Sequence, residues 1–422
     1  MVEFSRFDDI LPKLVFDDSP CGGALTIFQD GQCVVNTAFG QANAQNVWTP
    51  TTLSVNFSIG KGVMATLIAV LVSQGLLAYD KPISTYWQAF GVNGKQAITL
   101  EDVLRHRAGL FNITKVMSAP EEAADWQAMC KKIADMPIDT PIKQGDTVYA
   151  SAYSALVSGW ILGAVVEKVT QLPLQQALET YLTDPLGVTG EMYFGLPAQK
   201  LDDIALPYRL FFGEAERKKP TLKPDSPETK AFLNGLPVSA LWQKTTGVPA
   251  GELTTATINR LYFDTSKMVM ANYKNALLFD GKTPLNYHDK HLLGAPIPAA
   301  NGISSSRALA VMYAMHANEG IWQDRVVIDK TVLDKLRIPA QSGFDAVMPA
   351  DMRWRLGFHR LFSVQEAPSA YGHMGYNGSV AFCDPSRRLA VAFIHNFDTT
   401  MLNDVRQFVV SELALLASDT CA

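Results

Sequence analysis

Strand-forming segments stand at both ends of this chain, and they constrain its fold more than any other feature. Near the start, residues 24–40 place Asp30 and Gly31 between two β-prone runs, and Asp-Gly readily supplies the positive φ angles of a two-residue hairpin turn. Near the end, residues 379–383 and 389–396 are β-prone and flank the turn-forming DPSRR. The sequence therefore predicts an antiparallel sheet built from both chain ends.

The middle of the chain, from about residue 86 to residue 290, is richer in helical patterns. After Thr399, apolar residues again recur at helical spacing and predict a terminal amphipathic helix. We expect an α/β fold in which an antiparallel β-sheet is flanked by helices. Residues 1–85 and 291–422 are expected to form the α/β domain, and residues 86–290 a mostly helical inserted region.

Composition and charge narrow the class of protein. The chain has 422 residues, 48% of them hydrophobic, and a net charge of −5, which is typical of a large buried core and argues against nucleic acid as a partner. The longest apolar run, Val63–Val72, is about half of the roughly 20 residues that a membrane span needs. With no signal-peptide pattern at the N-terminus, we expect a cytoplasmic protein without a membrane span.

Cysteines and histidines give no sign of a disulfide framework or a metal site. The 5 cysteines are odd in number, scattered and free of any CxxC spacing. His288 and His291 share a face of any helix there, but no third ligand accompanies them. We expect no metal and no cofactor. Residues 213–250 mix prolines and charges without a clear period, which favours a solvated surface loop over a lid.

Ser58-Ile59-Gly60-Lys61 is the only Ser-x-x-Lys spacing in the chain, and it opens a helical pattern that runs to about Leu77. Residues three apart share a helix face, so the Lys61 amine can reach the Ser58 hydroxyl, and the helix N-terminus favours the negative charge that develops during attack. An apolar helix would also lower the pKa of the amine. No G-x-S-x-G nucleophile elbow is present. The pattern predicts Ser58 as a nucleophile activated by Lys61.

Two further groups suit the same chemistry. Tyr149 lies just before a helical run, where a tyrosine could take or relay the serine proton. His373-Met374-Gly375-Tyr376 precedes the C-terminal hairpin. Glycine at 375 would let a substrate lie against the strand edge, and the backbone N–H of Tyr376 could join that of Ser58 as an oxyanion hole.

Large aromatic residues are candidates for an apolar acyl pocket, although packing in the core explains each of them equally well. The candidates are Trp126, Phe211, Phe212, Trp242 and Tyr376.

Taken in order, these motifs resemble the class C β-lactamase-like serine hydrolases, the penicillin-recognising family that includes β-lactamases, D,D-peptidases, D-aminopeptidases and family VIII carboxylesterases. The resemblance spans about residues 22–115, 141–185 and 297–397. It implies the serine β-lactamase and penicillin-binding-protein fold, Ser58 as nucleophile, Lys61 as its activating neighbour and Tyr149 as general base. It also implies no cofactor and a small-molecule ester or amide as substrate.

Two departures from the family pattern bear on the substrate. Ser151 stands where β-lactamases usually have asparagine, and His373-Met374-Gly375 replaces Lys-Thr-Gly, which removes a fixed positive charge that would hold a lactam carboxylate. Both favour a carboxylesterase acting on small or short-chain esters. A β-lactamase, a D-aminopeptidase or D,D-peptidase, and a small-molecule acyltransferase remain alternatives, and a non-catalytic peptidoglycan-binding or scaffold protein is a more distant one.

Overall fold

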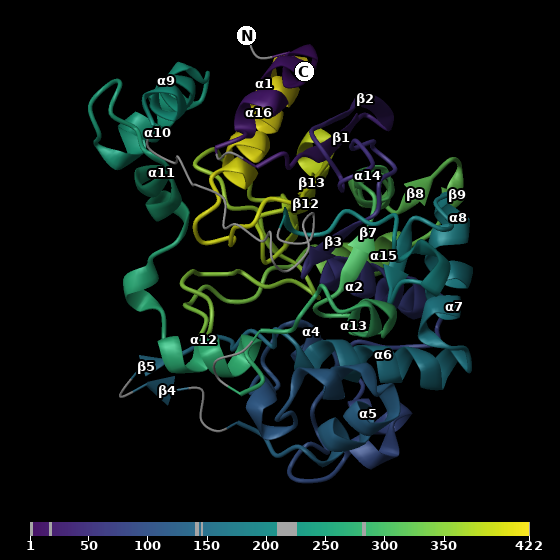
Figure 1. Ribbon diagram of the computed structural model, residues 1–422. Coiled ribbons are helices and arrows are strands. Elements are labelled where there is room, and N and C mark those ends of the chain that lie inside the picture. Colours follow the sequence, from purple (N-terminus) through teal and green to yellow (C-terminus); the bar gives the residue numbers. More distant parts are fainter. Residues whose placement is uncertain are drawn as a thin grey trace.

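Figure 1 presents the computed structural model, in which the two chain ends lie close together beside one sheet. The structure describes residues 3–16, 19–139, 143–144, 147–208, 226–280 and 284–421. A six-stranded sheet has the order β10-β11-β12-β13-β1-β2, and every neighbouring pair is antiparallel. Its strands are β1 (Gly23–Gln29), β2 (Gln32–Phe39), β10 (His359–Arg360), β11 (Tyr371–Met374), β12 (Val380–Asp384) and β13 (Leu389–His395).

Both predicted hairpins are confirmed, and β1 pairs with β13 along its whole length. Asp30 and Gly31 have φ angles of 52° and 75° at the β1–β2 turn, as the Asp-Gly dipeptide predicts. The predicted terminal helix is α16 (Arg406–Cys421). The α/β fold with an antiparallel sheet made from both chain ends is therefore confirmed.

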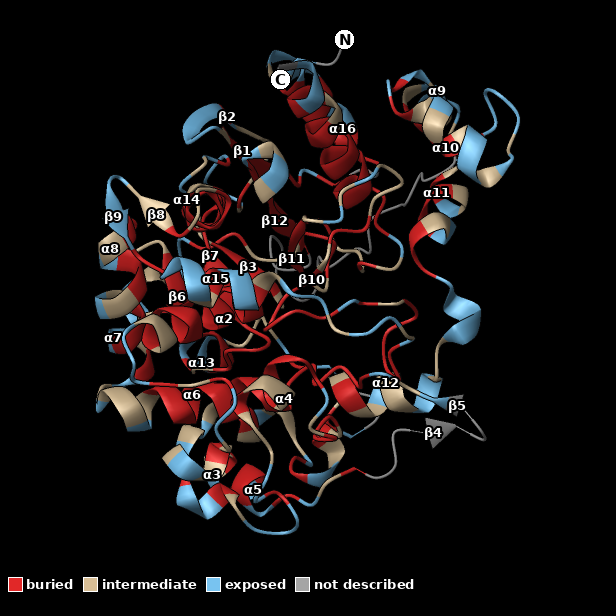
Figure 2. Ribbon diagram, turned by 180° about the vertical axis from the view of Figure 1, so that it is seen from behind, coloured by how far each residue is buried: buried red, intermediate tan, exposed pale blue. Residues whose placement is uncertain are grey.

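The central strand β13 is buried at all seven positions because helices cover both faces of the sheet. Successive side chains on a strand point to opposite faces. Ala390 and Ala392 belong to the hydrophobic cluster that includes helices α2 (Ile59–Ser73) and α14 (Ser306–Ala317). Val391 and Phe393 belong to the cluster that includes α16. Figure 2 shows α2 and α16 largely buried.

A smaller sheet carries the nucleophile segment. Its order is β3-β7-β6, from β3 (Ser54–Phe57), β7 (Gly302–Ser304) and β6 (Met192–Phe194). Since β3 leads directly into α2, this sheet fixes the start of the helix. The strand β6 comes from the helical middle of the chain. It lies in the same sheet as β3, which precedes that middle in the sequence, and β7, which follows it.

In the described part of residues 86–290, helices are the main regular structure, and the short β4 (Lys143–Gln144) and β5 (Thr147–Val148) are the only strands besides β6. The division of the chain into an α/β domain and an inserted region stays a prediction. The remaining helices are α1 (Phe7–Ile10), α3 (Ile83–Tyr86), α4 (Leu100–Leu104), α5 (Trp126–Asp135), α6 (Val157–Thr170), α7 (Leu174–Leu178), α8 (Asp184–Leu186), α9 (Pro227–Gly235), α10 (Ser239–Thr246), α11 (Thr255–Tyr262), α12 (Met270–Leu277), α13 (Lys290–Gly294) and α15 (Lys330–Arg337).

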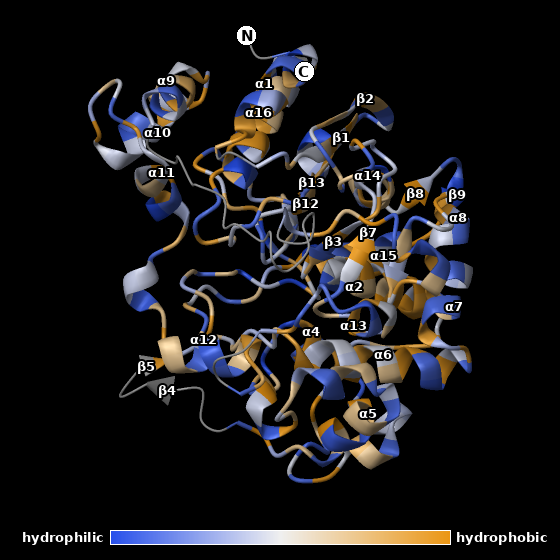
Figure 3. Cartoon of the chain, in the orientation of Figure 1, coloured by the Kyte–Doolittle hydropathy of each residue, from blue (hydrophilic) through white to orange (hydrophobic). Residues whose placement is uncertain are grey.

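The expectation of a surface loop over residues 213–250 is wrong for its described part. Residues 213–225 lie outside the described residues, but residues 226–250 contain α9 and α10. Ser226 caps α9 by accepting a hydrogen bond from the Thr229 N–H, and Trp242 of α10 is fully buried. Figure 3 shows hydrophilic turns on α9. Because this short amphipathic helix is rich in polar residues, its composition resembles that of a surface loop.

Among the described residues, no helix is long and apolar enough to cross a membrane.

Candidate active site

Ser58 stands at the N-terminus of α2, where a serine usually caps the helix with its hydroxyl. Here the side chain makes no capping hydrogen bond, so the hydroxyl is available for other partners. The preceding residue, Phe57, has a φ of 54°, which is strained for a side chain of this size. A Cβ on Gly60 would lie 2.8 Å from the Cα of Gly302. Glycine at positions 60 and 302 therefore lets the first turn of α2 lie close to β7, and this contact holds Ser58 in place.

Lys61 is confirmed as the neighbour of Ser58. Its Nζ lies 3.0 Å from Ser58 Oγ, 2.7 Å from the Ala155 carbonyl oxygen and 2.6 Å from the Ala299 carbonyl oxygen. Burial lowers the pKa of this amine well below its usual value, and burial is the only cause acting on it. A neutral amine would donate its two N–H groups to the two carbonyls and direct its lone pair at the Ser58 hydroxyl.

The structure corrects the tyrosine assignment, because it brings Tyr153 to the nucleophile in place of Tyr149. The Tyr153 hydroxyl donates to Ser58 Oγ at 2.9 Å. Tyr149 is half-buried against a hydrophobic cluster, and the N–H of the next residue, Ala150, bonds the Phe344 carbonyl. Burial raises the pKa of Tyr153, and the Asp345 carboxylate adds to the rise. Tyr153 is therefore a protonated donor at neutral pH.

A local signal could have separated the two tyrosines. Neither is followed by the asparagine of the family pattern, since Ser151 and Ala155 occupy the positions two residues later. Tyr149, however, follows the polar run KQGDT, whereas Tyr153 lies among small residues just ahead of the apolar helix α6. An acid–base group that contacts a serine at the start of a buried helix must itself be partly buried. The apolar residues around Tyr153 in the sequence therefore favour Tyr153.

Ser151 does not line the pocket at Ser58 and instead supports the loop that carries Tyr153. Its hydroxyl donates to Asp345 Oδ2 at 2.6 Å, and the Trp354 indole donates to the same oxygen at 3.1 Å. The Tyr153 N–H donates to Asp345 Oδ1 at 3.1 Å. Trp354 in turn stacks on the Tyr153 ring at 5.4 Å between centroids. One buried carboxylate thus anchors both the backbone and the stacking partner of Tyr153, and no sequence pattern predicts this role for Asp345.

His106 holds the same loop from the other side. Its carbonyl accepts the Ala152 N–H at 2.9 Å, its Nδ1 accepts the Ser154 N–H at 3.2 Å, and its ring meets the Tyr153 ring edge-on at 5.0 Å. Burial keeps the pKa of this imidazole well below its usual value. A neutral Nδ1 can therefore act as the acceptor that this loop requires.

The backbone amides expected to form an oxyanion hole are free to do so. Within the described stretches of the chain, neither the Ser58 N–H nor the Tyr376 N–H donates an intramolecular hydrogen bond, and both residues line the same pocket. The reason for glycine at 375 differs from the expected one. A Cβ there would lie 2.6 Å from the Asn56 carbonyl oxygen, so Gly375 allows this segment to pack closely on β3.

His373 does not line the pocket that contains Ser58. Its Nδ1 donates to the Met374 carbonyl at 2.8 Å, its Nε2 is buried without a partner, and its ring lies 6.2 Å from that of Tyr153. Burial lowers the pKa of His373 well below its usual value, and the neighbouring His359 and Lys61 lower it further. The ring is therefore a neutral group behind Tyr153 that cannot replace a lysine ammonium.

The pocket at Ser58 is apolar. It is bordered by Tyr153, Tyr287, Tyr376 and aliphatic residues of α12 and its neighbours. Of the aromatic candidates, only Tyr376 lies here among the described ones: Trp126 bonds Glu167 at the α5–α6 contact, and Trp242 bonds Tyr262 in the core. Phe211 and Phe212 lie outside the described residues.

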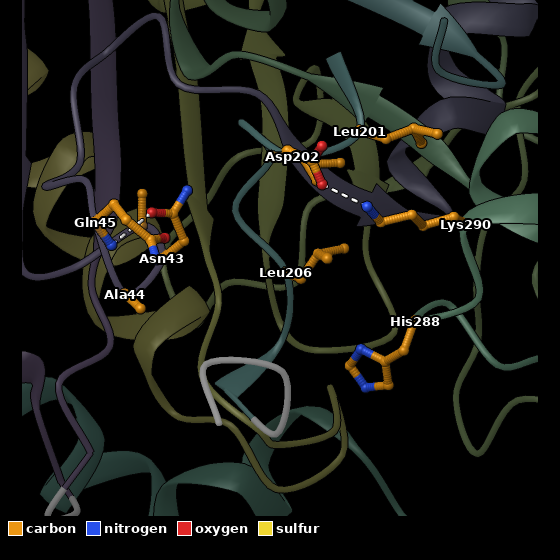
Figure 4. A pocket seen from close by; sticks show the side chains of 10 residues that line it. Asn43, Ala44, Gln45, Leu201, Asp202, Leu206, His288 and Lys290 are labelled. Atoms are coloured by element: carbon orange, nitrogen blue, oxygen red, sulfur yellow. Dashed lines mark hydrogen bonds and ion pairs between the residues drawn. The ribbon is translucent and has the colours of Figure 1, made fainter. Parts of the chain in front are cut away.

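The histidine pair considered for metal binding lies elsewhere. Figure 4 shows His288 in a surface pocket where Lys290 points toward Asp202, with which it forms an ion pair. His291 is not among the residues that line this pocket. In the described part of the chain, no three His, Cys, Asp or Glu side chains are grouped to hold a metal ion.

The depressed pKa of Lys61 has a consequence for stability. Between the lowered pKa of the folded state and the ordinary value of 10.5, the unfolded chain carries a proton on Lys61 that the folded chain lacks, so unfolding takes up a proton. Within this window and relative to Lys61→Met, the unfolding free energy of the wild type should therefore rise with pH, by up to about 1.4 kcal/mol per pH unit. Urea titrations of both proteins at pH 7, 8 and 9 measure this slope. If the unfolding free energies of the two proteins changed equally with pH, Lys61 would be charged in the folded state.

Comparisons with known proteins place the whole chain in one family. The family model described as "Beta-lactamase" matches residues 7–414. The chain is 29% identical over 378 residues to "Esterase/beta-lactamase LipL" of Mycobacterium tuberculosis, covering 89% of this chain and 77% of that protein. A solved penicillin-binding protein homologue from Caulobacter crescentus is 26% identical with a TM-score of 0.73, covering 98% of this chain and 97% of that one. A solved family VIII carboxylesterase shares the fold at 24% identity, with a TM-score of 0.74 and coverage of 100% and 98%.

Proposed function

The chain belongs to the beta-lactamase family and is a serine hydrolase, and we propose that it is a carboxylesterase that cleaves small or short-chain esters through an acyl-enzyme on Ser58. The observation that carries the proposal is the hydroxyl of Ser58 held between Lys61 Nζ and the Tyr153 hydroxyl, at 3.0 and 2.9 Å. A binding protein has no use for a serine activated in this way.

The lining of the pocket supports a neutral, short acyl group. Its free volume is about 40 Å³, room for a few water molecules and far below the roughly 300–1,000 Å³ of pockets that enclose drug-sized ligands. Besides Ser58, the described side chains around it are apolar or tyrosine, and none of them is an arginine or lysine. Bulky β-lactams would lack space there, and the described lining offers their carboxylate no cationic partner.

In the first half of the reaction, the neutral Lys61 amine takes the Ser58 proton while Oγ attacks the ester carbonyl. The N–H groups of Ser58 and Tyr376 stabilise the oxyanion. The leaving alkoxide receives the Tyr153 proton, which Lys61 restores to the phenol oxygen. Water then attacks the acyl-enzyme, loses its proton through the same pair, and releases the acid and the free Ser58 hydroxyl.

The name of one relative, "Esterase/beta-lactamase LipL", includes both activities, and the other candidates on this scaffold are D-aminopeptidase, D,D-peptidase and acyltransferase. We propose a cytoplasmic location, which the thiols of Cys33, Cys130 and Cys383 support, since such thiols persist in reducing compartments.

Substrate preference tests the proposal. We expect kcat/KM for p-nitrophenyl butyrate to exceed that for nitrocefin by at least ~10²-fold, because a misfit of a few kcal/mol corresponds to this factor. The same enzyme preparation is assayed on p-nitrophenyl octanoate and a D-alanyl amide as well. The expected order is butyrate above octanoate, with nitrocefin and the amide last. Faster cleavage of nitrocefin or the amide would replace the carboxylesterase by that activity.

A further inference from the structure

A second pocket lies beside the segment that carries Trp354. Trp354 stacks on Tyr153, whereas its neighbours Arg353 and Arg355 line an open pocket of about 560 Å³. Arg360 of β10 lines the same pocket. We call it the arginine pocket, defined by Arg353, Arg355 and Arg360. It shares no lining residue with the pocket at Ser58.

Arg355 is fixed in place but incompletely bonded. Its Nε donates to the Arg337 carbonyl at 3.0 Å and its Nη2 to the Pro368 carbonyl at 2.8 Å. Its Nη1 is buried and has no hydrogen-bond partner, and the whole residue is only 3% exposed. Two neutral carbonyls orient this guanidinium without neutralising its charge.

Arg360 has even fewer hydrogen-bond partners than Arg355. Its guanidinium lies over the Phe362 ring at 5.0 Å, and its buried Nε has no hydrogen-bond partner. Among the residues that the structure describes, neither Arg360 nor Arg355 forms an ion pair, and the third arginine, Arg353, pairs only with Asp351 at 3.4 Å. Buried cations in folded proteins are normally paired, because an unpaired one loses its hydration without compensation.

The charges around the arginine pocket do not cancel. Burial lowers the pKa of both Arg355 and Arg360, and the nearby Arg353 guanidinium lowers it further. Among the residues that line the pocket, three guanidinium groups stand against one carboxylate, that of the exposed Glu366 on the rim, so the lining is positive. Outside the lining, Asp351 already bonds Arg353 and the Ser342 hydroxyl. The buried Glu412 carboxylate is engaged by the Ser363 hydroxyl and the Gln365 amide, which donate to it at 2.8 and 2.6 Å.

We propose that the arginine pocket binds a phosphate-type oxyanion, either free phosphate or the phosphoryl group of a phosphomonoester. Guanidinium groups present planar forks of donors that match the oxygens of phosphate, and such charge-assisted bonds are among the strongest that proteins form. One carboxylate ligand would engage a single fork, whereas a tetrahedral oxyanion offers oxygens to more than one. The volume also leaves room for the organic part of a small phosphomonoester.

Isothermal titration calorimetry on the full chain tests this site. Inorganic phosphate should bind the wild type saturably with one site per chain, at an ionic strength held constant with NaCl. Arg360→Met keeps an unbranched side chain over Phe362 but removes the charge, and it should weaken binding about tenfold or more, the usual effect of losing hydrogen bonds to a charged group. Arg353→Gln, at the exposed rim, should weaken binding less. Arg325→Gln, on the exposed strand β9 (Arg325–Val326), is the matched control and should bind as the wild type does.

A second readout separates an anion site from a structural role for Arg360. In phosphate-free buffer, Arg360→Met should melt at the same temperature as the wild type or higher, because it removes an unpaired guanidinium. Phosphate should then raise the melting temperature of the wild type but not of Arg360→Met. Glycerol phosphate in place of phosphate identifies the source: tighter binding points to a phosphomonoester, and weaker binding to the free ion. The absence of saturable binding, or equal affinity in the wild type and Arg360→Met, would overturn the proposal.

Discussion

Ser58→Ala should abolish turnover while leaving the fold intact. We expect kcat for p-nitrophenyl butyrate to fall by about 10⁴-fold or more, because the hydroxyl is the atom that bonds to the acyl group. Alanine fits at the start of α2, since the serine hydroxyl makes no capping bond there. The thermal melt should therefore stay within a few degrees of the wild type.

A fluorophosphonate probe supplies the control for this variant. Mass spectrometry should find one adduct on the wild type and on Ser266→Ala, which alters an exposed serine, and no adduct on Ser58→Ala. An adduct that persists in Ser58→Ala would place the nucleophile at another serine.

Tyr153→Phe should be almost as damaging as Ser58→Ala, and Tyr149→Phe should be nearly silent. Phenylalanine at 153 keeps the ring that stacks on Trp354 and removes only the hydroxyl that donates to Ser58. We expect kcat to fall by at least ~10²-fold, the usual effect of a positioned acid–base group. Tyr149→Phe is the matched control, because it removes the same atom four residues earlier.

The double variant Tyr153→Phe/Lys61→Ala tests whether the two groups act as one unit. If they do, the double variant should be little worse than either single variant. A large loss in Tyr149→Phe with near wild-type activity in Tyr153→Phe would restore the original assignment, and the model of proton transfer given above would fail.

The sheet could be predicted because its signals are local. Asp30-Gly31 specifies the first hairpin and DPSRR the last, and each turn brings its own two strands together. The pairing of β1 with β13 is a contact between the two chain ends, and no local signal specifies its register. The strand β6 carries no such signal, because its three residues pair with a strand more than a hundred positions away.

The site could be predicted only as far as local spacing reaches. Ser58 and Lys61 lie on one turn of α2, so helix geometry alone joins them. Tyr153 reaches Ser58 through a loop whose path depends on Asp345 and His106, and these are distant in sequence. The sequence analysis therefore named Tyr149 alone, on a family pattern whose asparagine is absent two residues after either tyrosine. Helix α9 was missed for a related reason, since its burial depends on partners outside its own segment.

Trapping of the acyl-enzyme tests the central claim most directly. The wild type is mixed with excess p-nitrophenyl butyrate, quenched in acid within the first turnover and digested for peptide mass spectrometry. We expect one butyryl group on the peptide that contains Ser58, together with a burst of p-nitrophenol equal to the enzyme concentration if hydrolysis of the acyl-enzyme is the slower step. Butyrylation at any other residue, or hydrolysis with no acylated peptide even in a variant slowed by Tyr153→Phe, would contradict a reaction through Ser58.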